Sequence, residues 1–266
     1  MAVRDESFHA AAAACALLSA LLIQIGTNFY NDYADFRRGA DAEDRLGPQR
    51  ATQAGLVKPR QMWWAATIAF ALAFVGGLYL IVRGGWPILA IGLASIGAGY
   101  LYSATRFALA YTGLADLFVL VFFGPVAVGG TYFVQALSVT PAVVVAGIAP
   151  GLLSTAILLV NNIRDVEQDR AAAKQTLVVR LGRPFGVGLY LVCLAIAALV
   201  PAVLFVAFGG TAASLAAVLV LPLGLPLFQH LRSTSDGAML NVTLASTARL
   251  LFIYSIVFAI GWNTGL

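Results

Sequence analysis

The chain has 266 residues, of which 61% are hydrophobic and only 11% are charged, with a formal net charge of +4. This composition excludes a soluble domain, because its apolar stretches reach the roughly 20 residues that a helix needs to cross a ~30 Å hydrocarbon layer. Cys15 and Cys193 each stand alone inside an apolar stretch, so the sequence indicates neither a disulfide nor a cysteine metal site.

Eight apolar stretches are expected to span a membrane, and they lack the alternation of polar and apolar residues that barrel strands have. The predicted fold class is therefore all-α, a multi-pass transmembrane helical bundle forming a single domain over residues 1–266. In chain order the expected spans are Phe8–Gly26, Met62–Val82, Trp86–Ala104, Leu114–Val134, Pro141–Val160, Phe185–Phe208, Thr211–Phe228 and Leu244–Trp262.

The basic residues are distributed unevenly over the loops that these spans define. Thirteen of the sixteen Lys and Arg residues fall in the loops after the first, third, fifth and seventh spans, which share one side of the membrane. The positive-inside rule makes that side cytoplasmic. We therefore expect a multi-pass protein of the cell inner (plasma) membrane with both chain ends on the outer side.

Acidic residues gather where the first and fifth spans end, in NFYNDYADFRRGAD and NNIRDVEQDR. Eight of the twelve acids fall between Asp32 and Asp44 or between Asp165 and Asp169. On a helix, an asparagine and two aspartates share one face in each cluster. These sets are Asn28, Asp32 and Asp35 in the first cluster and Asn162, Asp165 and Asp169 in the second.

Carboxylate and amide oxygens are ligands that Mg²⁺ prefers, and this ion commonly bridges carboxylates to substrate phosphates. Arginine and lysine follow both clusters, and these side chains bind phosphate oxygens. The sequence therefore predicts a Mg²⁺-diphosphate site on the cytoplasmic side. The alternative, ordinary surface charges paired with one another, is favoured for Glu43, Asp44, Arg60, Glu167 and Arg183.

Three segments closely resemble the two aspartate-rich motifs of the UbiA-type intramembrane prenyltransferases: NDYADFRRGAD, DRLGPQRA and NNIRDVEQDRAAAKQTLVVRLG. Within this family they are most similar to the 1,4-dihydroxy-2-naphthoate polyprenyltransferases of menaquinone synthesis. The resemblance covers almost the whole chain and implies the UbiA-like helical fold.

The resemblance implies that two Mg²⁺ ions are held by the catalytic residues Asp32, Asp35, Asp165 and Asp169. These ions would bind a polyprenyl diphosphate and stabilise its leaving group. The allylic carbocation would be captured by 1,4-dihydroxy-2-naphthoate, which loses CO₂ and gives demethylmenaquinone. The expected partners are a polyprenyl diphosphate, an aromatic acid acceptor and the lipid bilayer, without nucleic acid.

Further substrate-binding residues follow from the same motif match, with Arg50 and Lys174 as the preferred diphosphate ligands. They are Asn28, Asn31, Asp41, Arg45, Arg50, Lys58, Asn161, Asn162, Arg164, Lys174 and Arg180.

A third segment, LYSATRFALAYTGLADLFVLVFFG, resembles the family stretch in which a tyrosine-rich loop precedes G-L-G-D. This match implies that Tyr102, Tyr111 and Asp116 contact the aromatic acceptor or help to deprotonate it. The alternative is an interfacial tyrosine belt with a helix cap at Asp116.

Family members usually carry an additional first helix, and this sequence begins at the second one. We expect a longer open reading frame before Met1.

Three other functions were weighed against this one. The nearest is a UbiA-type enzyme with another acceptor, such as 4-hydroxybenzoate or homogentisate. A cation-coupled transporter is disfavoured because its coupling residues would lie near the bilayer midplane. A phosphatidyl-alcohol transferase would need glycine after Asp35, where this chain has Phe36.

Overall fold

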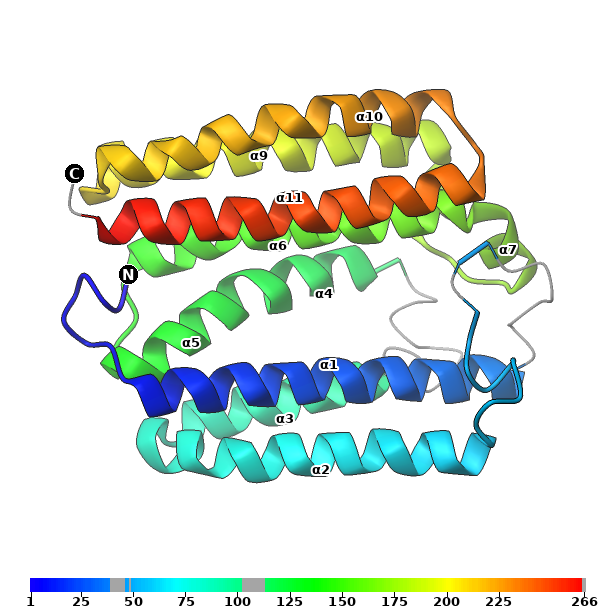
Figure 1. The fold of residues 1–266 in the computed structure, drawn as a ribbon, viewed down its shortest axis with the longest axis horizontal. Coiled ribbons are helices and arrows are strands. Elements are labelled where there is room, and N and C mark those ends of the chain that lie inside the picture. Colours follow the sequence, from blue (N-terminus) through cyan, green and yellow to red (C-terminus); the bar gives the residue numbers. More distant parts are fainter. Residues whose placement is uncertain (39–45, 48, 102–112, 265–266) are drawn as a thin grey trace.

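The computed structural model describes residues 1–38, 46–47, 49–101 and 113–264, and within these residues the only regular structure is helical (Figure 1). The helices are α1 (Ala10–Arg38), α2 (Pro59–Gly84), α3 (Trp86–Leu101), α4 (Ala115–Val121), α5 (Ala127–Ala136), α6 (Pro141–Arg164), α7 (Val166–Ala171), α8 (Leu177–Leu181), α9 (Arg183–Phe208), α10 (Gly224–Ser233) and α11 (Gly237–Asn263). A π-helical turn, η2 (Phe122–Val126), joins α4 to α5, and a 3₁₀ segment, η3 (Ala212–Leu223), precedes α10. The predicted all-α fold class is confirmed.

Seven helical stretches in the described part of the chain are long and apolar enough to cross a membrane. The third expected span, Trp86–Ala104, is represented by α3, an apolar helix of 16 residues. The last three residues of that expected span lie outside the described residues.

Two expected spans have different ends in the structure. Helix α1 continues twelve residues beyond Gly26 to Arg38, so Asp32 and Asp35 of the first acidic cluster lie on the helix itself. Helix α11 begins at Gly237, seven residues before the expected start, because the Asp236 side chain accepts the amide N–H of Ala238 and caps the helix. Arg249 consequently lies in the middle of α11, with an exposed side chain.

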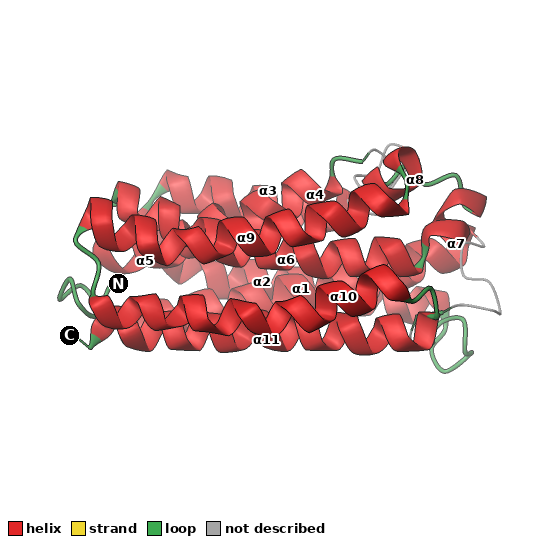
Figure 2. Cartoon of the chain, turned by 90° about the horizontal axis from the view of Figure 1, so that it is seen from above, coloured by secondary structure: helices red, strands yellow, loops and turns green. Residues whose placement is uncertain are grey.

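The helices form two groups, with α4 and α5 between them (Figures 1 and 2). Helices α6, α9, α10 and α11 share the main hydrophobic core, in which Leu153, Leu159, Tyr190 and Leu204 are fully buried. Helices α1, α2 and α3 have only small clusters of buried residues. The bundle is therefore tightly packed on one side and loosely packed on the other.

Helix α6 packs against the α4–η2 segment backbone to backbone. Gly124 and Pro125 interrupt the helical hydrogen bonding, and Gly124 has φ −110° and ψ −108°. Gly147 and Gly151 on α6 face this kink, and a Cβ atom on Gly151 would lie 2.4 Å from the carbonyl oxygen of Leu120. Glycines four residues apart allow such close approach between membrane helices. The contact fixes the end of α4 and the η2 turn against α6.

The end of the bundle away from α7 holds both chain ends (Figure 1). The backbone N–H of Arg4 donates to Asn263 Oδ1 at 3.1 Å, and the Tyr132 hydroxyl donates to Asp5 Oδ2 at 2.6 Å. These contacts tie the segment before α1 to α11 and α5. The acidic clusters lie at the opposite end.

Candidate active site

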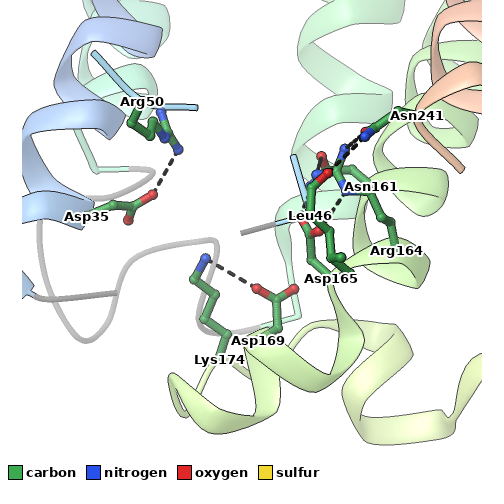
Figure 3. A network of polar contacts seen from close by, with 9 residues as sticks. All are labelled: Asp35, Leu46, Arg50, Asn161, Arg164, Asp165, Asp169, Lys174 and Asn241. Carbon is green, nitrogen blue, oxygen red and sulfur yellow. Dashed lines mark hydrogen bonds and ion pairs between the residues drawn. The ribbon is translucent and has the colours of Figure 1, made fainter. Parts of the chain in front are cut away.

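Both asparagine and aspartate clusters lie at the end of the bundle where α7 is found (Figures 1 and 3). The first cluster occupies the last third of α1. Asn161 and Asn162 belong to the last turn of α6, Asp165 lies between α6 and α7, and Asp169 is in α7. Segments 130 residues apart in the sequence thus contribute carboxylates to one region.

The two aspartates of α1 are more than nine-tenths buried and are held by the segment that precedes α2. Asp32 accepts backbone N–H groups from Ala51 at 3.1 Å and Thr52 at 3.4 Å. Asp35 Oδ2 lies 2.9 Å from Arg50 Nη2 (Figure 3). The predicted diphosphate ligand Arg50 is therefore positioned by a predicted metal ligand.

Arg164 organises the second cluster. Its guanidinium donates to both carboxylate oxygens of Asp165, at 2.7 and 2.6 Å. It also donates to Asn161 Oδ1 at 2.7 Å and to Asn241 Oδ1 at 2.6 Å (Figure 3). With only 6% of the residue exposed, Arg164 serves in this structure as a neutralising and positioning group for Asp165.

Asn241 was missed by sequence reasoning, since it looks like one polar residue at the start of an apolar run. Its side chain also donates to the carbonyl oxygen of Leu46 at 2.8 Å. Helix α11 and the segment after α1 therefore both meet the second cluster. The sequence signal that could have identified Asn241 is its side-chain amide within a membrane-spanning helix, because polar side chains there are often functional.

Asp169 is 6% exposed and pairs with Lys174 Nζ at 3.2 Å. Burial raises the pKa of Asp169 above its ordinary value, and the carboxylates of Asp165 and Asp35 raise it further, while Lys174 acts in the opposite direction. Asp169 is thus repelled electrostatically by carboxylates of both clusters. A bound cation would relieve this repulsion.

The donor set fits a hard divalent cation, since four carboxylates with neighbouring amide groups are oxygen ligands of the kind that Mg²⁺ takes. Among the described residues, no three acidic, histidine or cysteine side chains are grouped closely enough to hold a metal ion as they stand. Each of the four carboxylates instead accepts a protein donor. Metal binding would have to replace at least part of these contacts.

The remaining predicted residues fall into three groups. Lys58 and Arg180 are exposed, Lys58 as the N-cap residue of α2 and Arg180 in the last turn of α8. Asn28 and Asn31 line a cavity that runs along α1. Asp41, Arg45, Tyr102 and Tyr111 lie outside the described residues.

Asp116 is 5% exposed, and neither of its carboxylate oxygens has a hydrogen-bond partner. The residue before α4 is Leu114, and the Asp116 side chain makes no capping hydrogen bond, so the alternative role as a helix cap is wrong. Asn162 Nδ2 on α6 is also buried without a partner. Two unsatisfied polar groups in a membrane core indicate a site for a polar ligand.

A cavity of about 460 Å³ follows α1 between α2, α3 and the α4–α5 segment. It is lined by Asn28 and Asn31 at the acidic end and by Ala16 far along α1. Fifteen helical residues separate Asn31 from Ala16, which corresponds to about 22 Å. Its walls are mostly apolar, with Phe74, Phe118 and Phe122 among them.

These features define a multi-pass helical membrane protein with a carboxylate-rich site at one end and an elongated apolar cavity beside it. Residues 1–262 match the model of the UbiA prenyltransferase family. The chain belongs to this family, which confirms the resemblance seen in its aspartate motifs.

Individual relatives agree with this assignment. The chain is 32% identical to a 1,4-dihydroxy-2-naphthoate octaprenyltransferase of Haemophilus influenzae, over 98% of this chain and 86% of the relative. It is 36% identical to the enzyme of the same name from Mycobacterium tuberculosis, over 92% of this chain and 82% of the relative.

Two solved structures have the same fold. A UbiA homologue from Aeropyrum pernix aligns with a TM-score of 0.71 at 20% identity, covering 94% of this chain and 90% of the homologue. A UbiA homologue from Archaeoglobus fulgidus, described as bound to DMAPP and Mg²⁺, aligns with a TM-score of 0.61 at 16% identity, covering 95% and 89%.

Proposed function

We propose that this protein transfers a polyprenyl group from polyprenyl diphosphate to 1,4-dihydroxy-2-naphthoate. The observation that carries the proposal is the meeting of the two aspartate clusters at one end of the bundle, beside an apolar cavity. The names of the two bacterial relatives support the naphthoate acceptor.

In the proposed reaction, the bond between the allylic carbon and the diphosphate oxygen breaks, and a carbon–carbon bond to the naphthoate ring forms. The ring carboxyl group leaves as CO₂, and the product is the quinol form of demethylmenaquinone. Inorganic diphosphate is the second product.

Two Mg²⁺ ions held by Asp32, Asp35, Asp165 and Asp169 would neutralise charge on the diphosphate as it leaves. The Archaeoglobus homologue, described as bound to DMAPP and Mg²⁺, supports Mg²⁺ and a prenyl diphosphate as the ligands of such a site. Arg50 and Lys174 now pair with Asp35 and Asp169, so both bases stand next to the groups that would receive the metal. If Asp35 and Asp169 bound the metal instead, Arg50 and Lys174 would be able to bind the diphosphate oxygens.

The apolar cavity is suited to the polyprenyl chain because it begins at Asn28 and Asn31 beside the metal ligands and continues along α1. Burying the chain there would also keep water away from the allylic cation. Asp116, whose two carboxylate oxygens have no hydrogen-bond partner, would accept a hydroxyl proton from the naphthoate, the role that the third family-like segment implies. Tyr102 and Tyr111 are assigned to the acceptor on the sequence resemblance alone.

The acidic end is proposed to face the cytoplasm of a cell whose inner (plasma) membrane holds the protein. The basic residues that accompany the two clusters support this orientation. Both soluble substrate groups, the diphosphate and the aromatic acid, would then reach the site from the cytoplasm.

The test is an assay of purified protein with Mg²⁺, a polyprenyl diphosphate and each aromatic acid in turn. We expect CO₂ release and a prenylated product with 1,4-dihydroxy-2-naphthoate, and no turnover once EDTA has removed the metal. Prenylation of 4-hydroxybenzoate or homogentisate without reaction of the naphthoate would contradict the acceptor. Ion flux in proteoliposomes without any prenyl transfer would favour a transporter.

The site residues are tested by Asp165→Asn and Asp169→Asn, with Glu167→Gln as the matched control. Glu167 lies between them, is exposed and pairs only with Arg170 in the described contacts. We expect both aspartate variants to lose turnover by about 100-fold or more, since a positioned metal supplies several kcal/mol. Asp169→Asn should remain folded, because burial already disfavours the charged form of Asp169. Full activity of this folded variant would show that Asp169 does not bind the metal.

A further inference from the structure

A second cavity lies between the start of α9 and the end of α10, outside the site described above. Its volume is about 410 Å³, and its lining consists of Arg183, Pro184, Val187, Gly188, Phe228 and Arg232. Two of the six residues are arginines, none is acidic, and the rest are apolar or glycine. The start of α9 and the end of α10, which line it, lie at the end of the bundle that carries the aspartate clusters (Figures 1 and 2).

Arg183 is held rigidly at the rim of this cavity. Its Nη2 donates to the carbonyl oxygen of Leu231 at 2.7 Å and to that of Thr234, which anchors the start of α9 to the end of α10. Its Nε is buried and has no hydrogen-bond partner. A buried charged donor left unsatisfied is unfavourable unless a ligand supplies an acceptor.

Two further features make the cavity attractive to an anion. Arg232 is exposed and forms no ion pair with any carboxylate in the described part of the chain. The 26-residue helix α9 begins here at Arg183, and its N-cap residue Gly182 provides no side-chain cap, so the positive end of the helix dipole points to the same region.

The apolar lining indicates that the anion carries a hydrocarbon chain. Val187 and Phe228 contribute apolar lining beside the arginines, and the neighbouring Phe185 of the spanning helix α9 is 42% exposed. Exposed apolar side chains of a spanning helix face lipid. Basic pockets between membrane helices on the cytoplasmic side suit lipid headgroups.

We propose that this groove binds an anionic phospholipid, with the phosphate between Arg183 and Arg232 and an acyl chain along Val187 and Phe228. The shared chemistry, a phosphate group, is also present in free inorganic phosphate. The apolar wall and the lipid-facing position favour the lipid. The groove is separate from the aspartate clusters, so this inference does not depend on the proposed prenyl transfer.

The test measures lipid binding to the full-length protein in detergent, by native mass spectrometry during titration with phosphatidylglycerol. We expect retained phosphatidylglycerol and much weaker retention of phosphatidylcholine, which carries no net charge. Arg232→Gln should weaken phosphatidylglycerol binding about fivefold, the effect of one basic residue on an anionic headgroup. Gly188→Phe should block binding without removing a charge, because a Cβ on Gly188 meets nothing within 4 Å.

The matched control is Arg60→Gln, which removes one exposed positive charge at the start of α2, on the other side of the bundle (Figure 1). This variant should bind phosphatidylglycerol like the unmodified protein. Equal binding by Arg232→Gln, Gly188→Phe and Arg60→Gln would overturn the proposal. Equal retention of the two lipids would also overturn it. Displacement of the lipid by an equal concentration of inorganic phosphate would show a soluble-anion site instead.

Discussion

The backbone contact between α6 and α4 at Gly151 leads to a quantitative prediction for Gly151→Ala. A Cβ atom there would lie 2.4 Å from the Leu120 carbonyl oxygen and 3.0 Å from the Gly124 Cα. Both are backbone atoms and cannot rotate away, so α6 must separate from the α4–η2 segment. The substitution therefore perturbs the helix contact that sets the position of Asp116.

The expected loss of stability follows from two opposing effects. Overpacking costs about 1–3 kcal/mol, and a clash with backbone on two residues places this site near about 3 kcal/mol. Alanine gains at most about 1 kcal/mol over glycine in helix propensity. The net loss of about 2 kcal/mol corresponds to a decrease in Tm of about 4–8 °C for a chain of this size.

The assay is thermal unfolding in a single detergent, followed by tryptophan fluorescence, with Gly129→Ala as the matched control. Gly129 lies in α5, and a Cβ atom there would meet nothing within 4 Å. We expect Gly129→Ala to leave the Tm unchanged or slightly raised. If both variants unfold at the same temperature, the close contact between α4 and α6 does not exist as described.

Two further predictions concern the proposed reaction. Asp116→Asn should leave the Tm unchanged, because the carboxylate makes no hydrogen bond. The same variant should lower kcat by about 100-fold or more, because it loses the proposed proton acceptor. An unchanged kcat would show that Asp116 takes no part in the reaction. Gly92→Phe should fill part of the apolar cavity from α3 without a clash, and should slow the reaction of long polyprenyl diphosphates more than that of short ones. Gly97→Phe is the control, because Gly97 is equally uncrowded but does not line the cavity. This control variant should keep the original preference for substrate length. The measurement is the relative rate with polyprenyl diphosphates of increasing length. An identical length preference in both variants would show that the prenyl chain does not occupy this cavity.

The membrane-spanning helices and the active end were predictable because they depend on features that the sequence displays directly. Apolar stretches of sufficient length become spans, and Asp32, Asp35, Asp165 and Asp169 all follow such stretches on the side rich in basic residues. Helices with alternating directions must bring these ends together. The placement of both clusters therefore follows from topology, before any side-chain contact is known.

The contacts within the site could not be predicted in the same way. Arg164 neutralises Asp165, its neighbour in the sequence, because the end of α6 at Asp165 turns the chain and brings the two side chains together. Asn241 joins them only because α11 packs beside α6. The groove with Arg183 and Arg232 likewise depends on how α9 and α10 meet, which no local pattern encodes.

The π-helical turn Phe122–Val126 also determines how α4 and α5 are oriented relative to each other. A π turn holds one residue more than an α turn, so deleting one residue there would rotate α4 by about 100° relative to α5. Asp116 would then leave its present direction while α5 stayed in place. The number of residues in this single turn thus sets the rotation of the half that carries Asp116 relative to the half that follows it, and an insertion or deletion at this point would rotate Asp116 about the helix axis.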